Sequence, residues 1–138
     1  MKAEELMIGD WVYNVHNKKP EQVQEIREEL IMLEYNDLYD YDEIEPIPLT
    51  AEILEMNGFI YYNYGHNNYG WKVDDYERFV IEKSYKNLYQ IDGDNSFHIG
   101  IVEADGESYC LLTFCTISCV HELQHALRLC GIDKEIVL

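Results

Sequence analysis

Hydrophobic and polar positions alternate along most of the chain, with the period of two that is typical of half-buried β-strands. In the first fifty residues this pattern predicts three short antiparallel strands, at about 10–15, 21–27 and 30–35. After residue 58 it predicts a second group of strands, which we place at 59–64, 69–73, 78–83, 87–92, 96–103 and 108–116. Asp105-Gly106 separates the last two, and this dipeptide is a strong signal for a β-hairpin.

Two segments depart from the alternation and predict helices. Thr50 is a suitable N-cap for a short helix over 51–56, because its hydroxyl can accept a hydrogen bond from a backbone N–H of the first turn. Ser118 is expected to cap a closing helix that runs to Cys130 and ends at Gly131, since glycine readily takes up the left-handed conformation that follows a helix.

The order of these elements predicts an α+β fold. Residues 1–49 are expected to form an N-terminal β meander that resembles an SH3-like barrel in size. Residues 50–138 are expected to form a short linking helix and an antiparallel sheet closed by the C-terminal helix. We expect the two regions to share one core, because fifty residues alone would bury little apolar surface.

Composition and charge narrow the classes of function. The chain has 138 residues, of which 47% are hydrophobic, so it has enough apolar mass for a packed core. Its 27 acidic and 10 basic residues give a net charge of −17, which argues against direct binding to nucleic-acid phosphates or to an anionic membrane. The acidic residues are concentrated in the segment 34–45, which we interpret as a solvated loop.

The chain is expected to be cytoplasmic, because no segment has the features of a membrane span or a signal peptide. The largely apolar, uncharged stretch 108–120 is too short for the roughly 20 residues that cross a bilayer. The N-terminal residues contain no apolar run of signal-peptide length, so we expect a cytoplasmic protein. In that compartment the four cysteines are expected to stay reduced and to pack as small apolar side chains, and none of their spacings forms a C-x-x-C motif.

Three segments together resemble a family of small uncharacterised proteins from prophages and other mobile elements of Bacteroides-type gut bacteria. They are Ile8-Gly-Asp-Trp-Val12, Ile44-Glu-Pro-Ile-Pro-Leu-Thr50 continuing to Asn57-Gly-Phe59, and Val120-His-Glu-Leu-Gln-His-Ala-Leu-Arg-Leu-Cys-Gly131. The resemblance covers most of the chain, with a variable middle. It implies a mobile-element origin, and the family provides no activity that can be carried over to this chain. Many relatives have Val-His-Gln-Leu-Gln-Asn in the last segment and lack the glutamate and the second histidine found here.

The sequence His121-Glu-Leu-Gln-His125 matches the H-E-x-x-H zinc signature. In a zinc-dependent hydrolase His121 and His125 would bind the metal and Glu122 would polarise the bound water. Against this, no third ligand follows at a known spacing. On a helical wheel the two histidines also lie opposite the leucine stripe, which predicts a solvent-exposed face. We therefore expect no cofactor, and zinc remains the alternative.

The segment 61–71 is rich in tyrosine, asparagine and glycine, which is typical of adaptable contact surfaces. Its aromatic residues Tyr61, Tyr62, Tyr64, Tyr69 and Trp71 are the candidate binding residues. The main hypothesis is a non-enzymatic accessory or protein-binding module with an unidentified protein partner. The alternative to such a surface is an ordinary hairpin whose rings cover the sheet.

A third hypothesis concerns the acidic segment 34–45. Its carboxylates could imitate the phosphates of DNA and occupy a basic host protein such as a nuclease or repressor. This function requires carboxylates held at fixed positions. The sequence leaves open that spacing, the identity of any partner and the oligomeric state.

Overall fold

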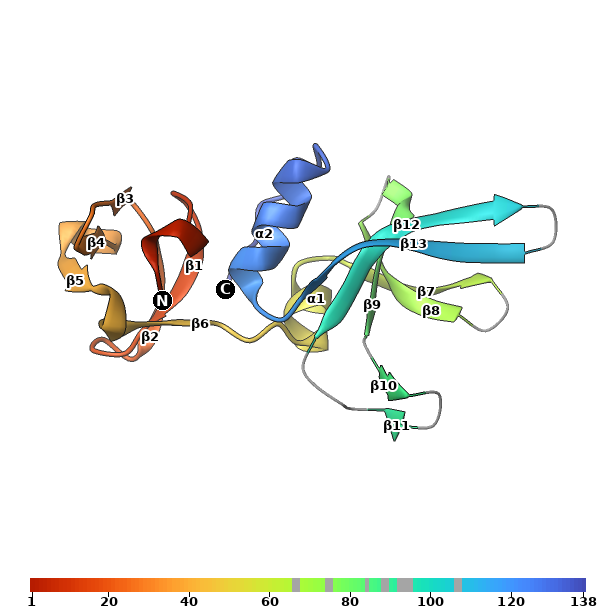
Figure 1. The fold of residues 1–138 in the computed structure, drawn as a ribbon, viewed down its shortest axis with the longest axis horizontal. Helices are drawn as coiled ribbons and strands as arrows, with labels where there is room; N and C mark the ends of the chain where they lie inside the picture. The colour runs from red at the N-terminus through yellow and green to blue at the C-terminus, as the bar shows by residue number, and fades with distance from the viewer. Residues whose placement is uncertain (66–67, 74–75, 84, 88–89, 92–95, 106–107) are drawn as a thin grey trace. The chain divides into compact units, whose positions relative to one another are not determined.

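The computed structural model describes the chain except residues 66–67, 74–75, 84, 88–89, 92–95 and 106–107 (Figure 1). The fold is mixed α+β, with mostly antiparallel sheets and a C-terminal helix, as the hydrophobic pattern predicts. The chain divides into two compact units. Unit 1 comprises 1–48, 119–136 and residue 138, and unit 2 comprises 49–118 and residue 137. The C-terminal helix therefore belongs with the N-terminal region, and not with 50–118 as expected.

Unit 1 contains two three-stranded antiparallel sheets, with strand orders β2-β1-β6 and β3-β4-β5. Its elements are η1 (Ala3–Glu5), β1 (Trp11–Asn14), β2 (Lys19–Gln22), β3 (Glu25–Ile26), β4 (Leu30–Met32), η2 (Glu34–Asn36), β5 (Leu38–Asp40), η3 (Tyr41–Glu43), β6 (Ile44–Pro46) and α2 (Val120–Leu129). The strand expected at 21–27 is divided in two. The Val23 N–H donates to the backbone carbonyl of Asp10, next to β1, whereas the Gln24 N–H donates to the backbone carbonyl of Met32 on β4. The chain therefore changes partner strand between these two residues.

The acidic segment 34–45 is ordered structure, which corrects its interpretation as a solvated loop. It contains η2, β5 and η3 and reaches into β6. Tyr39 and Ile44 within it are buried, because they belong to the apolar core of unit 1. The remaining buried members of that core are Leu6, Val12, Val23, Ile31 and Leu33. The buried side chains of Tyr39 and Ile44 therefore anchor the acidic segment to the core of unit 1.

Unit 2 is built on a five-stranded antiparallel sheet with the order β13-β12-β9-β8-β7. Its elements are α1 (Ala51–Met56), β7 (Ile60–Gly65), β8 (Asn68–Val73), β9 (Tyr76–Lys83), β10 (Tyr85–Asn87), β11 (Gln90–Ile91), β12 (Phe97–Asp105) and β13 (Ser108–Ile117). β12 and β13 form the predicted long hairpin, visible in Figure 1. The single strand predicted at 87–92 is wrong, because β10 and β11 pair there as a separate small hairpin.

Both helices begin and end close to the predicted residues. The hydroxyl of Thr50 accepts a hydrogen bond from the Ile53 N–H at 3.2 Å, which confirms the cap of α1. The N-cap of α2 is Cys119, one residue later than expected. Gly58 and Gly131 have φ values of +78° and +69°, so each helix is followed by the left-handed glycine that the sequence predicts. Within the described residues, neither helix has the length and apolar character needed to cross a bilayer.

Candidate functional site

The polar side of α2 is covered by the chain that leads into β1, and this overturns the expected solvent-exposed face. His121 is only 5% exposed and Gln124 is buried to a similar degree, as are the apolar residues Leu123 and Leu127. Helix α2 and strand β1 are in contact within unit 1. The helical wheel failed because it cannot show that a second element packs against the polar side.

Asp10 is the centre of this contact, and its side chain is fully buried. One carboxylate oxygen, Oδ2, accepts hydrogen bonds from the Met7 N–H at 2.7 Å and from His125 Nε2 at 2.6 Å. The other oxygen, Oδ1, accepts from Arg128 Nη1 at 3.0 Å. A buried carboxylate is costly unless such donors replace water. We call Asp10, His125 and Arg128 the Asp10 cluster.

Gln124 and Trp11 extend the contact on both sides of the Asp10 cluster. The Gln124 carboxamide accepts from the Trp11 N–H at 2.9 Å and donates to the Gly9 carbonyl at 3.0 Å. The Trp11 indole donates to the Ile136 carbonyl at 2.6 Å, which ties the C-terminal segment to β1. The conformation of residues 9–11 is therefore set by α2 and by the residues that follow it.

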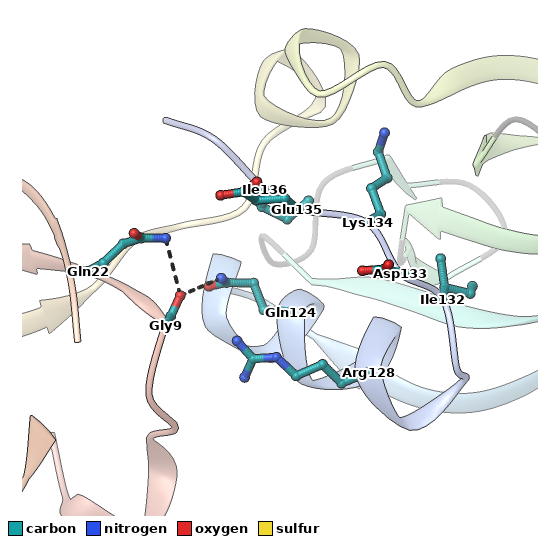
Figure 2. Close-up of a pocket in the computed structure, with 9 residues that line it drawn as sticks. All are labelled: Gly9, Gln22, Gln124, Arg128, Ile132, Asp133, Lys134, Glu135 and Ile136. Atoms are coloured by element: carbon teal, nitrogen blue, oxygen red, sulfur yellow. Dashed lines mark hydrogen bonds between the residues drawn. The ribbon is translucent and has the colours of Figure 1, made fainter. Parts of the chain in front are cut away.

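A cavity of about 360 Å³ lies beside this contact (Figure 2). Its lining combines amide, charged and apolar groups from Gly9, Gln22, Gln124, Arg128 and the segment 132–136. Gly9 has a φ of +88°, and a Cβ at this position would lie 3.5 Å from Nη2 of Arg128. Glycine therefore gives the left-handed turn that brings the backbone close to the guanidinium.

His121 lies in a different environment from His125. Its Nε2 is 3.7 Å from Sγ of Cys119, and its Nδ1 has no hydrogen-bond partner among the described residues. The two imidazole rings meet edge to face, with centroids 5.7 Å apart. Burial lowers the pKa of His121, against the opposing effect of the Asp10 and Glu122 carboxylates.

This geometry does not fit the zinc site of the H-E-x-x-H signature. Ligation requires one nitrogen of each histidine to point at a common metal, but His125 Nε2 is bonded to Asp10 and His121 Nε2 faces Cys119. The carboxylate of Glu122 accepts a hydrogen bond from the Cys119 N–H at 3.3 Å, so it caps the helix. Among the described residues, no three or more His, Cys, Asp or Glu side chains gather in a metal-binding arrangement.

The aromatic segment divides between the two faces of the sheet. Tyr61 and Trp71 lie directly opposite each other on β7 and β8, with ring centroids 4.8 Å apart. Trp71 is only 7% exposed and packs edge to face on Phe97, so it supports the core of unit 2. This burial differs from the expectation that Trp71 is a binding residue. Tyr62 points to the other face, where the Lys72 ammonium lies 4.9 Å from its ring centroid. The side chains of Tyr64 and Tyr69 lie outside the part that the structure describes.

The sequence did not identify Asp10 and Gln124 as the residues that join the start of β1 to α2. Gly9-Asp10 was interpreted only as a turn signal, and a single acidic residue before a strand has no periodicity that would mark it as buried. The spacing of His121, Gln124, His125 and Arg128 was the available signal, because residues three and four apart share one side of a helix. No family model, curated protein or solved structure matches this sequence.

Proposed function

We propose that this chain is a non-enzymatic protein-binding module of a mobile element, and that it binds its partner through Met56, Ile60 and Tyr61, which we call the 56–61 surface. The observation that carries the proposal is the exposure of these large apolar side chains, at 68%, 46% and 53%. Ile60 and Tyr61 are neighbours on β7, the strand at one edge of the sheet, so their side chains flank that edge on opposite faces. Large apolar side chains that remain exposed close together in the chain often mark interaction sites.

The residues beneath this surface hold it in place. The ring of Tyr61 rests on Trp71, and Trp71 in turn packs on Phe97 in the core of unit 2. Leu54 and Phe59, which lie within and just after α1, are buried. An exposed aromatic ring that is already ordered loses little conformational entropy on binding, so it suits the role of an interface anchor.

The Asp10 cluster supports a non-enzymatic role. His125 and Arg128 are both bonded to one buried carboxylate, and Gln124 is bonded to the backbone on either side of it. These polar side chains, which include the second histidine of the H-E-x-x-H motif, therefore hold the start of β1 against α2. This supports a structural role for the H-E-x-x-H segment, and it leaves the 56–61 surface as the best-supported binding feature.

The proposal is tested by photo-crosslinking in a lysate of bacteria that carry the element. The crosslinker benzoylphenylalanine replaces Met56 in the test protein and Tyr35 in the control, because Tyr35 is an exposed aromatic residue of unit 1. We expect a discrete adduct from position 56 alone. In that background, Tyr61→Ala should reduce the adduct about tenfold, as loss of an interface anchor does. Equal adducts from both positions, or full capture by Tyr61→Ala, would contradict the proposal.

The acidic segment supports a second candidate, an inhibitor that imitates DNA. Asp37, Asp40, Asp42 and Glu45 are exposed, and they lie on or beside β5, η3 and β6, so their backbone positions are fixed. This candidate predicts salt-sensitive retention of a basic host protein. Retention should be lost in the combined Asp37→Asn, Asp42→Asn and Glu45→Gln variant and unchanged in Tyr61→Ala, the reverse of the result expected for the main proposal.

A further inference from the structure

A thiol and an imidazole lie together at the N-terminal end of α2. Sγ of Cys119 is 3.7 Å from Nε2 of His121, and the two residues are 6% and 5% exposed. We propose that Cys119 is a peroxide-reactive thiol, which hydrogen peroxide oxidises to a sulfenic acid while His121 accepts the thiol proton. This inference is independent of the proposed binding function.

The helix favours the thiolate form of Cys119. Cys119 is the N-cap of a ten-residue helix, and its sulfur faces the backbone N–H of Glu122 in the first turn. The N-terminal end of a helix carries partial positive charge, and cysteines placed there ionise more readily. Burial of Cys119 and the nearby Glu122 carboxylate act in the opposite direction. The bond from the Cys119 N–H directs the Glu122 carboxylate at the backbone, and the His121 imidazole offers the thiol proton an acceptor.

His121 provides the second, independent observation. Its side chain is more than nine-tenths buried, and Nδ1 has no partner among the described residues although Nε2 faces the thiol. A buried polar atom without a partner is costly, so this one favours a small hydrogen-bonding molecule beside the ring. Because burial lowers the pKa of His121, the ring is neutral at pH 7 and can accept a proton. The carboxylates of Asp10, Glu122 and Glu5 then stabilise the imidazolium, while His125 opposes it.

The reaction is balanced with peroxide as the only co-reactant. The thiol proton moves to Nε2 of His121, and the thiolate attacks one oxygen of hydrogen peroxide. An S–O bond forms and the O–O bond breaks. The departing hydroxide takes the proton back from the imidazolium and leaves as water. The sulfur is oxidised by two electrons to sulfenic acid, and the peroxide is reduced.

The burial of Cys119 limits the reagents that can reach it. A side chain with 6% exposure is accessible to a molecule of about the size of water and is shielded from bulky alkylating agents. Cys130 is the matched internal control, because it is exposed and lies at the other end of the same helix. Burial of part of its side chain raises the pKa of the Cys130 thiol, which disfavours its thiolate.

The test uses the full chain, exposed to a short pulse of hydrogen peroxide at pH 7. Catalase ends the pulse, the protein is unfolded in urea with dimedone, and peptide mass spectrometry quantifies the sulfenic acid at each cysteine. We expect Cys119 to be oxidised at least about tenfold faster than Cys130, because only Cys119 has an imidazole base beside its thiol. N-ethylmaleimide, which is bulky, should show the opposite preference.

Two variants complete the experiment. His121→Gln preserves the size and polarity of the side chain but cannot accept the proton, so the Cys119 rate should fall to that of Cys130 or below. Cys119→Ser should abolish the adduct assigned to this residue. Circular dichroism checks that each variant is folded. The proposal is overturned if Cys119 in the native chain reacts no faster than Cys130, or if folded His121→Gln retains the native rate.

Discussion

The stability of unit 1 depends strongly on one carboxylate. Asp10 is fully buried, and three donors, two on α2 and one in the segment before β1, replace the water that it would bind in the unfolded chain. Removing such a charge leaves the donors of its partners without an acceptor, which costs more than the original contact contributes. The side chains of His125 and Arg128 are partly exposed, so water recovers some of this loss.

Asp10→Asn should therefore lower the free energy of unfolding by about 2–4 kcal/mol. The amide keeps the size of the side chain but carries no charge and accepts at only one of its two terminal atoms. Urea denaturation measures the change. The matched control is Asp37→Asn, which removes an exposed carboxylate and should alter stability by less than about 0.5 kcal/mol. Equal effects of the two variants would contradict the assigned role of Asp10.

Tyr35 is held in a backbone conformation that is unfavourable for its residue type. It has a φ of +70°, it is followed by Asn36 with a φ of +63°, and its side chain is 75% exposed. The two residues turn the chain between β4 and β5. The left-handed conformation costs a bulky residue about 1–2 kcal/mol, whereas the exposed contact of its ring with the Lys19 ammonium contributes about 0.5–1 kcal/mol.

Tyr35→Asn should consequently stabilise the protein by roughly 0.5 kcal/mol, because asparagine tolerates positive φ. Tyr35→Val also removes the ring but adds a β-branched side chain at positive φ, so it should destabilise by about 1 kcal/mol. Urea midpoints compare the two variants. If valine and asparagine have the same effect, the strain at Tyr35 is not significant.

At the scale of elements, the sequence predicted the bounds of both helices, but it did not predict which residues pack against them. Thr50 and Gly58 mark the ends of α1 through local hydrogen bonding and backbone conformation, which neighbouring residues determine. The contacts of the polar side of α2 depend on residues more than a hundred positions away in the sequence, because Gln124 bonds to Trp11 and His125 bonds to Asp10. No local pattern carries that information.

The burial of His121 predicts how the free energy of unfolding of the protein depends on pH. Its pKa is lowered in the folded protein, so below about pH 6.5 the unfolded chain binds a proton that the folded chain does not. This residue leaves the free energy of unfolding unchanged above that pH. Below it the free energy of unfolding falls, by up to about 1.4 kcal/mol per pH unit, until the folded-state pKa is reached.

Urea denaturation at pH 7.5, 6.5 and 5.5 measures this dependence. His121→Gln should reduce the loss of stability between pH 6.5 and 5.5, because glutamine does not titrate. The control is His16→Gln, which makes the same substitution at an exposed histidine of unit 1. A slope that survives in His121→Gln would assign the pH dependence to other groups.

At the scale of the whole molecule, the chain builds unit 1 from both of its ends. Residues 1–48 supply the strands and 119–136 supply α2 and the segment that Trp11 holds. Residues 49–118, which form almost all of unit 2, are inserted between them. Pro48 and Cys119 pair as an antiparallel bridge, so the two pieces of unit 1 meet where the insertion begins and ends.

A chain in which Asn-Gly directly joins residue 48 to residue 119 should therefore fold without residues 49–118. A two-residue turn suits an antiparallel pair, and Asn-Gly is a preferred sequence for it. Residues 1–48 alone should remain unfolded, because Asp10 and Trp11 would lose their partners on α2 and on the segment that follows it. Near-ultraviolet circular dichroism and fluorescence report on Trp11, the single tryptophan of the joined chain. A folded 1–48 fragment would show that α2 is dispensable.

The sequence by itself determined the α+β class, both helices, most of the strands and the β12–β13 hairpin. These features depend on alternation, capping residues and turn residues that act over a few positions. Only the tertiary structure decided that α2 belongs with the first 48 residues, that Asp10 binds His125 and Arg128, and that Trp71 is buried. Each of these depends on contacts between segments far apart in the chain, and a one-dimensional pattern does not specify which surfaces meet.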